Sequence, residues 1–169
     1  MTDVLTTARL MLRRITMDDV LAMHAIFADT DAMRYWSRLP HTEVAETESW
    51  VARTIAANES GEGDDFVVIR DGALVGRIGI WQGNEVGLIF APEVWGTGVA
   101  REAMEVLVRH ARARRMTSLM ADIDPRNTRV RRFLEKLGFR KTGAAKGTYK
   151  IGDIWTDSEY LTLDLSGES

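Results

Sequence analysis

Cysteine is absent from the sequence, which excludes disulfide bridges, thiolate zinc sites and a cysteine nucleophile. No stretch approaches the roughly 20 consecutive apolar residues that a membrane-spanning helix needs. The opening residues Met1-Thr2-Asp3 have neither the basic flank nor the apolar run of a secretory leader. We therefore expect a cytoplasmic protein that acts without a membrane or a metal, and whose chemistry uses other side chains.

An excess of basic charge is also absent. The formal net charge is −3 and the isoelectric point is about 5.7, whereas domains dedicated to nucleic acids are usually strongly basic. We therefore expect no nucleic-acid partner. Basic residues nevertheless gather between Arg126 and Lys150, where the single acid is Glu135. A solvated basic helix and hairpin would explain this gathering, and so would attraction of an anionic ligand such as a coenzyme with three phosphates.

The chain has the size and composition of one globular domain. Its 169 residues are 45% hydrophobic and 28% charged, close to ordinary usage, so we expect a single domain over residues 1–169. The first half predicts a strand around Leu10–Arg13, helices that begin after Thr16 and Thr42, and an antiparallel meander. The three strands of this meander, joined by short turns, are Phe66–Ile69, Leu74–Ile80 and Glu85–Phe90.

The second half of the chain alternates helices with strands. A helical stripe from Ala100 to Ala111 precedes a short buried strand, Leu119–Ile123, and this order predicts parallel neighbouring strands. Asn127 opens another helix that Gly138 closes, and two strands follow at about 140–150 and 155–165. These elements predict an α/β (α+β) fold, in which about four helices flank a mixed, mostly antiparallel sheet of about seven strands.

The turn Gly96-Thr97-Gly98 lies between the strand that ends at Phe90 and the next helix. Main-chain N–H groups and the positive end of a helix converge there, which favours an anion, although an ordinary turn before a helix also fits. A P-loop requires Gly-Lys-Ser/Thr, but Val99-Ala100 follows the second glycine. A dinucleotide fingerprint requires a small residue where Arg101 stands, so both of these phosphate-binding motifs fit poorly.

The segment from Glu93 to Ala103 resembles the pyrophosphate loop of the GNAT acetyltransferase superfamily, whose general form is Q/R-x-x-G-x-G/A. Its Trp-Gly-x-Gly-x-Ala-x-Glu-Ala pattern is similar to the branch that contains the ribosomal-protein N-terminal acetyltransferases RimJ and RimL. Three other segments agree in the expected order, at 7–13, 127–139 and 157–163. The resemblance thus covers nearly the whole chain.

This resemblance implies that acetyl-CoA is the cosubstrate and that the sheet is splayed in the middle, between Glu85–Phe90 and Ser118–Ile123. The pantetheine arm is expected in the gap, paired with main-chain groups near Leu88 and Phe90. The pyrophosphate is expected on the loop amides of Trp95, Gly96, Thr97, Gly98, Val99, Ala100 and Arg101. Asn127 resembles a residue that contacts the coenzyme or the reacting acetyl group, while an N-cap role is compatible. Phe133 matches an aromatic beside the thioester arm, although its spacing alone indicates core.

The sequence departs from the family pattern at three positions. Glu93 stands where the loop usually begins with Gln or Arg, which costs one side-chain contact. Many members carry a general-acid Tyr where this chain has Leu134, and some of the ribosomal-protein branch carry Ser at Val130. The general acid is therefore unassigned, and the thiolate leaves without one or takes a proton from water.

The expected reaction is direct attack of a neutral amine on the thioester, because no cysteine or Gly-x-Ser-x-Gly element suggests an acyl-enzyme. Glu85, at the head of the splayed strand, is the candidate base, because the resemblance implies that a carboxylate near this position serves as the base, and a solvated strand-end Glu is the alternative. We expect a protein N-terminal α-amino group as acceptor, with a polyamine, an antibiotic amine or a non-catalytic acyl-CoA sensor as alternatives. Tyr35, Trp36 and Trp155 are expected at the acceptor, although the first two also suit core packing. We expect a monomer or homodimer.

Overall fold

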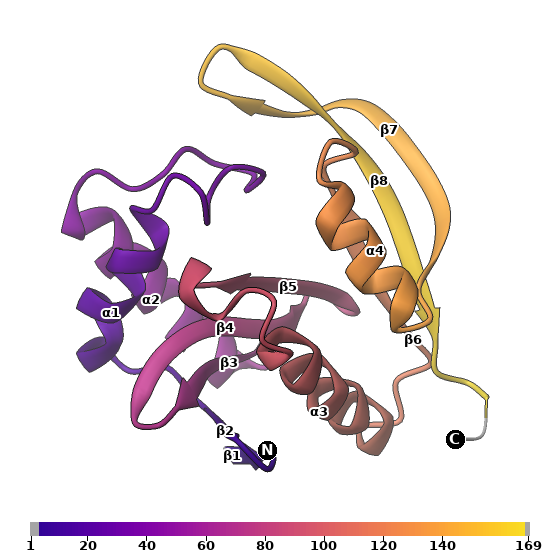
Figure 1. The fold of residues 1–169 in the computed structure, drawn as a ribbon, viewed down its shortest axis with the longest axis horizontal. Helices are drawn as coiled ribbons and strands as arrows, with labels where there is room; N and C mark the ends of the chain where they lie inside the picture. The colour runs from indigo at the N-terminus through magenta and orange to yellow at the C-terminus, as the bar shows by residue number, and fades with distance from the viewer. Residues whose placement is uncertain (1–3, 168–169) are drawn as a thin grey trace.

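The computed structural model describes residues 4–167, where one eight-stranded sheet carries α-helices on both faces (Figure 1). The residues Met1-Thr2-Asp3, on which the expectation about a leader is based, lie outside this range. None of the helices within it is both long and apolar enough to cross a membrane. The elements are β1 (Val4–Thr6), β2 (Leu10–Arg13), η1 (Met17–Asp19), α1 (Val20–Phe27), α2 (Val44–Ser60), β3 (Gly63–Arg70), β4 (Ala73–Trp81), β5 (Glu85–Phe90), η2 (Pro92–Val94), α3 (Val99–Ala113), β6 (Ser118–Ile123), α4 (Thr128–Lys136), β7 (Arg140–Ile151) and β8 (Ile154–Asp164).

The sheet has the order β1-β2-β3-β4-β5-β6-β8-β7, and all neighbours are antiparallel except β5 and β6. The predicted mixed, mostly antiparallel sheet is therefore confirmed, with eight strands rather than about seven. The additional strand is β1, whose three residues are too few for a periodic pattern to be read from sequence. The predicted parallel crossover through α3 is also confirmed.

Two hydrophobic cores lie on opposite faces of the sheet, because successive strand residues point to opposite sides. Phe66 and Val68 of β3 pack with α3, whereas Val67 between them packs with α1 and α2. The helix ends follow the local signals. A capping box joins Thr16 and Asp19 before α1, and Gly138 adopts φ 101° after α4.

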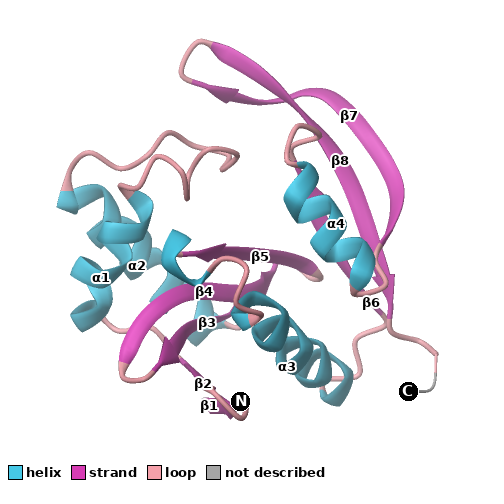
Figure 2. Cartoon of the chain, viewed as in Figure 1, coloured by secondary structure: helices cyan, strands magenta, loops and turns pink. Residues whose placement is uncertain are grey.

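The sheet splits between β5 and β6. A single residue pair, Glu85 with Met120, joins these strands, next to a hydrogen bond from Met120 N to Asn84 O at 2.9 Å. By contrast, β6 pairs with β8 along all six of its residues, from Ser118 to Ile123. Beyond the single pair, β5 and β6 diverge as Figure 2 shows, so the predicted splay is confirmed.

A buried ion cluster centred on Asp64 joins β3 to its neighbours on one face of the sheet. Its carboxylate contacts His110 Nε2 of α3 at 2.6 Å, Arg114 Nη1 at 2.6 Å and Arg14 Nη2 at 2.8 Å. Burial opposes ionisation, but the hydrogen bonds and charges of His110 and Arg14 hold the pKa of Asp64 well below its ordinary range. The charged carboxylate therefore stabilises the fold at neutral pH, and this contribution is lost only in strong acid.

We expect Asp64→Asn to lower the free energy of unfolding by about 3–5 kcal/mol at pH 7, because it removes the charge of a buried carboxylate that His110, Arg114 and Arg14 contact at 2.6–2.8 Å. Urea denaturation at fixed temperature measures this loss. Asp71→Asn is the matched control, since Asp71 is 93% exposed and its 3.8 Å ion pair with Arg70 lies in water. Equal stability of the two variants would show that the Asp64 cluster does not hold the sheet.

Candidate active site

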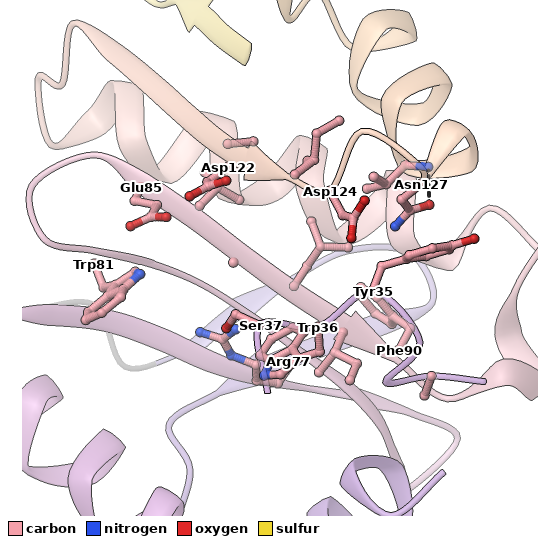
Figure 3. Close-up of a pocket in the computed structure, with 18 of the residues that line it drawn as sticks. Tyr35, Trp36, Ser37, Arg77, Trp81, Glu85, Phe90, Asp122, Asp124 and Asn127 are labelled. Atoms are coloured by element: carbon pink, nitrogen blue, oxygen red, sulfur yellow. Dashed lines mark hydrogen bonds between the residues drawn. The ribbon is translucent and has the colours of Figure 1, made fainter. Parts of the chain in front are cut away.

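A continuous cleft of about 2190 Å³ follows the gap between β5 and β6 (Figure 3). Its walls come from the loop around Tyr35, from β5, from the glycine turn, from α4 and from the tip of the β7–β8 hairpin. Most of the residues predicted to bind ligands line it: Tyr35, Trp36, Glu85, Leu88, Phe90, Trp95, Gly96, Gly98, Ala100, Arg101, Asn127 and Phe133. Three do not line it, namely Thr97, Val99 and Trp155.

One edge of β5 has main-chain groups that no neighbouring strand pairs. Ala91 N donates to Val75 O at 2.9 Å, and hydrogen-bonded residues alternate in an antiparallel pair. The peptide groups of Gly87 and Ile89 therefore face β4, whereas those of Leu88 and Phe90 face the gap. The indole N–H of Trp95 donates to the Phe90 carbonyl at 3.0 Å. The main-chain N–H and C=O of Leu88 and the N–H of Phe90 are therefore available to hydrogen-bond a ligand with amide groups, such as a pantetheine arm.

The glycine turn places the open end of α3 against the cleft. Gly96 and Gly98 adopt φ of 74° and 84°, a region that L side chains rarely enter, and Gly98 is the N-cap of α3. The N–H groups of the first helical turn have no partner within the helix. The N–H of Thr97 is not free in this way, because both its N–H and its hydroxyl donate to Val94 O. Val99 is fully buried and contributes its side chain to the core.

The glycine turn is fastened to the β1–β2 connection. Arg9 Nη1 donates to Thr97 O at 3.3 Å, and Arg9 Nε donates to Glu102 Oε1 of α3 at 3.0 Å. The Thr7 hydroxyl donates to the same carboxylate. The turn and the first turn of α3 are thus held together by a segment about 90 residues earlier in the chain.

The basic residues on and around α4 include some that serve the fold and some that line the cleft. Arg131 pairs with Glu159, and Arg140 donates to the carbonyls of Glu135 and Phe139, so these two serve the fold. Arg101, Arg129, Arg132 and Lys136 line the cleft, with Arg129 4.9 Å from the ring centroid of Trp95. Four cations beside a helix N-terminus suit a ligand with several phosphates. The residues present therefore fit coenzyme A.

Asn127, at the start of α4, both caps the helix and lines the cleft. Its Oδ1 accepts from Val130 N at 3.2 Å, which is an N-cap bond, and the residue also lines the cleft. Phe133 packs against the core and lines the cleft as well. Leu134 is 1% exposed and Val130 is apolar, so neither supplies a proton to a leaving group.

Two carboxylates and a phenol meet on the side of the cleft opposite α4. Glu85 and Asp122 lie close together in Figure 3, and Tyr149 Oη donates to Asp122 Oδ2 at 2.8 Å. Asp122 Oδ1 is buried and has no hydrogen-bond partner within residues 4–167. Burial, assisted by the negative charge of Asp122, raises the pKa of Glu85 above its ordinary value of 4.5. Glu85 is thus a stronger base than a solvated glutamate.

Sequence reasoning did not find Asp122, Tyr149, Arg77 or Trp81, all of which line the cleft. Asp122 is the one charged residue in the otherwise apolar strand 119–123, and this position could have indicated a functional role. Among the predicted aromatics, Trp36 both packs on Phe27, with 6.1 Å between ring centroids, and lines the cleft. Trp155 is 62% exposed on β8, outside the lining, and its role stays a prediction. No group of His, Cys, Asp or Glu suited to a metal ion occurs in the described range.

Comparison with known proteins identifies the family to which the chain belongs. The sequence profile of the acetyltransferase (GNAT) domain matches residues 9–140. The chain belongs to the GNAT acetyltransferase family. It is similar to the uncharacterized N-acetyltransferase YnaD of Bacillus subtilis (strain 168), with 26% identity over 167 residues that cover 94% of this chain and 95% of YnaD.

Two solved structures show the same fold at low sequence identity. The first is an acetyltransferase from Salmonella typhimurium that modifies the N-terminal serine of ribosomal protein L7/L12. It has a TM-score of 0.85 and 16% identity, covering 96% of this chain and 99% of that chain. The second is a spermidine N-acetyltransferase from Vibrio cholerae in complex with CoA and spermine. It has a TM-score of 0.81 and 21% identity, covering 95% and 98%.

We expect Gly98→Val in this GNAT domain to weaken coenzyme A binding at least about tenfold, because a branched side chain would stand where anions approach the helix amides. The thermal shift is the measurement, since a ligand at about 100 times its Kd stabilises the native state by roughly 2.7 kcal/mol. Gly72→Val is the control, because Gly72 has a similar φ of 79° in the β3–β4 turn, outside the cleft. A Gly98 variant with the parental shift would contradict this loop assignment.

Proposed function

We propose that this protein transfers an acetyl group from acetyl-CoA directly to a primary amine, and that the preferred acceptor is a protein N-terminal α-amino group. The observation that carries the proposal is the position of Glu85, a carboxylate of raised pKa at the head of the splayed strand. The same strand presents the unpaired main-chain groups of Leu88, and the glycine turn opens into the same cleft. A base, an oxyanion donor and an anion site thus share one cavity.

Each residue has a role in this reaction. Acetyl-CoA supplies the activated acetyl thioester. Glu85 accepts a proton from the acceptor ammonium, directly or through water, so that the neutral amine attacks. The N–H of Leu88 is oriented toward the gap before the reaction and suits the developing oxyanion. Asn127 lies beside the acetyl region and holds the start of α4.

The leaving thiolate takes its proton from water in this proposal. Leu134 and Val130 carry no acidic proton, and Tyr149 is a phenol that lines the cleft next to Asp122. Burial raises the pKa of Tyr149, and its bond to Asp122 and the charges of Asp122 and Glu85 raise it further. Its proton is committed to Asp122, so we assign Tyr149 no role as general acid.

Acid–base chemistry favours an α-amino group as acceptor. An α-ammonium has a pKa of about 8 against about 10.4 for lysine, so one moderately basic carboxylate suffices to deprotonate it near neutral pH. The Salmonella typhimurium relative in fold, which modifies an N-terminal serine, supports this choice. A polyamine is the second candidate, because Glu85 and Asp122 place two carboxylates in one pocket, and a solved neighbour is a spermidine acetyltransferase.

The proposal is tested by following coenzyme A release from acetyl-CoA across peptides with free N-termini, polyamines and aminoglycosides. We expect the largest kcat/KM for the peptides. Turnover restricted to spermidine or spermine would support the second candidate instead. Binding of acetyl-CoA without turnover of any amine would show a non-catalytic sensor.

We expect Glu85→Gln to lower kcat by about 10²- to 10⁴-fold at pH 7, the usual contribution of a positioned base, with little change in coenzyme affinity. The parental kcat/KM should fall as the pH drops through the raised pKa of Glu85, because the protonated carboxyl accepts no proton. The variant should regain part of the loss as the pH rises and more amine is neutral.

Stopped-time assays between pH 5 and 9 check this expectation. Glu48→Gln is the matched control, because Glu48 is exposed on α2 and lies outside the cleft. Turnover of the Glu85 variant close to that of the control across the whole range would remove Glu85 from the mechanism.

A further inference from the structure

A buried arginine lies beneath the acceptor half of the cleft. Arg77 of β4 is 7% exposed and pairs with Asp65 of β3, which accepts from Arg77 Nε at 3.1 Å and also from Nη2. Two indoles flank the guanidinium, with its carbon 5.5 Å from the ring centroid of Trp50 and 6.0 Å from that of Trp36. The pair is thus fixed in position at the floor of the cleft.

Two glycines create the space for this pair. Gly79 and Gly87 are opposite each other on β4 and β5. A Cβ on Gly79 would lie 2.5 Å from an oxygen of Asp65, and a Cβ on Gly87 would lie 2.8 Å from Arg77 Nη1. Neither glycine has a positive φ, so the backbone does not demand glycine there. The absence of side chains at both positions lets the guanidinium extend across β4 to β5.

One edge of the guanidinium has no protein partner. Nε and Nη2 donate to Asp65, whereas Nη1 makes no hydrogen bond to any residue in the described range. Arg77 lines the cleft beside Ser37 and Trp36 (Figure 3). Because Arg77 pairs with Ile89 of β5, its side chain lies on the sheet face that Glu85 also uses. A cationic donor that the protein leaves unpaired at a cleft binds well to an oxygen acceptor that reaches it.

The positions of this donor and of Glu85 suit a specific chemical group. Glu85 and Gly87 lie two residues apart on one face of β5, and Nη1 of Arg77 approaches the place that a Cβ on Gly87 would occupy. An α-aminoacyl group carries an amine for Glu85 and, on the next carbon, a carbonyl oxygen that accepts a hydrogen bond from Nη1. A simple alkylamine offers nothing to Nη1, and the second ammonium of a polyamine would be repelled by the guanidinium.

We propose that Arg77 is a specificity residue that binds the carbonyl or carboxylate oxygen next to the acceptor amine, so that the enzyme selects α-aminoacyl compounds. This inference rests on the acetyl transfer proposed above and narrows its acceptor. A peptide N-terminus and a free α-amino acid both present this group.

The test compares four acceptors at equal concentrations of neutral amine: a tripeptide with a free N-terminus, alaninamide, alanine and 2-aminopropane. Alaninamide and 2-aminopropane share a skeleton and differ in the carbonyl group. We expect kcat/KM to be at least about tenfold higher for alaninamide, as expected for one charge-assisted hydrogen bond. The tripeptide and alanine distinguish a protein terminus from a free amino acid as the source of the group.

Two variants remove the proposed contact in different ways. Arg77→Lys keeps the charge beside Asp65 but loses the second donor edge. Gly87→Ala keeps the pair and places a Cβ against Nη1. We expect each to lose most of the preference for alaninamide over 2-aminopropane, mainly through KM, while the thermal shift with coenzyme A persists. Gly143→Ala on β7 is the control, because its new Cβ would make an ordinary contact outside the cleft.

The outcomes separate this inference from the proposed function. A preference that is unchanged in both variants, or a parental enzyme that acetylates 2-aminopropane as well as alaninamide, would overturn the role of Arg77 and leave acetyl transfer intact. A parental enzyme that acetylates no amine would refute the proposed function, and this inference with it.

Discussion

The parting of β5 from β6 is the constraint on which the rest of the structure depends. Main-chain N–H and C=O groups that face an apolar interior must find partners, and a strand edge inside a sheet normally finds them in its neighbour. Here the neighbour is present at one residue pair and absent beyond it. The cleft exists because α3 and α4 fill one side of this gap without closing it, and the Trp95 indole satisfies only one of the exposed carbonyls.

Charges of both signs line the cleft. The helices α3 and α4 contribute Arg101, Arg129, Arg132 and Lys136, whereas Glu85 and Asp122 lie where β5 and β6 pair. The first set suits a cosubstrate with several negative charges, and in the proposed reaction the two carboxylates suit a cationic acceptor. The Asp65–Arg77 pair adds a cation on the sheet face of Glu85, because Arg77 is paired with Ile89 of β5.

The glycine turn, the helix that follows it and the cap at Asn127 were predictable from the sequence, because each depends on a few consecutive residues. The cleft residues Arg77, Asp122 and Tyr149 were not, because they come from three strands and reach the cleft only through sheet register. Glu85 was predicted through the family resemblance, but its neighbour Asp122 required the pairing of Glu85 with Met120. Trp155 lies on β8, exposed and outside the cleft lining, so its role at the acceptor stays a prediction.

The bonds from Thr7 and Arg9 to Glu102 and Thr97 have a consequence for how the protein is made and shortened. Glu102 of α3 is synthesised about 90 residues after the segment that holds it, so the glycine turn acquires its final shape only once α3 has been made. Removing residues 4–9 would take away no side chain that lines the cleft within the described range and would still loosen the glycine turn. Thr7 and Arg9 therefore belong to the smallest fragment that keeps this turn in place.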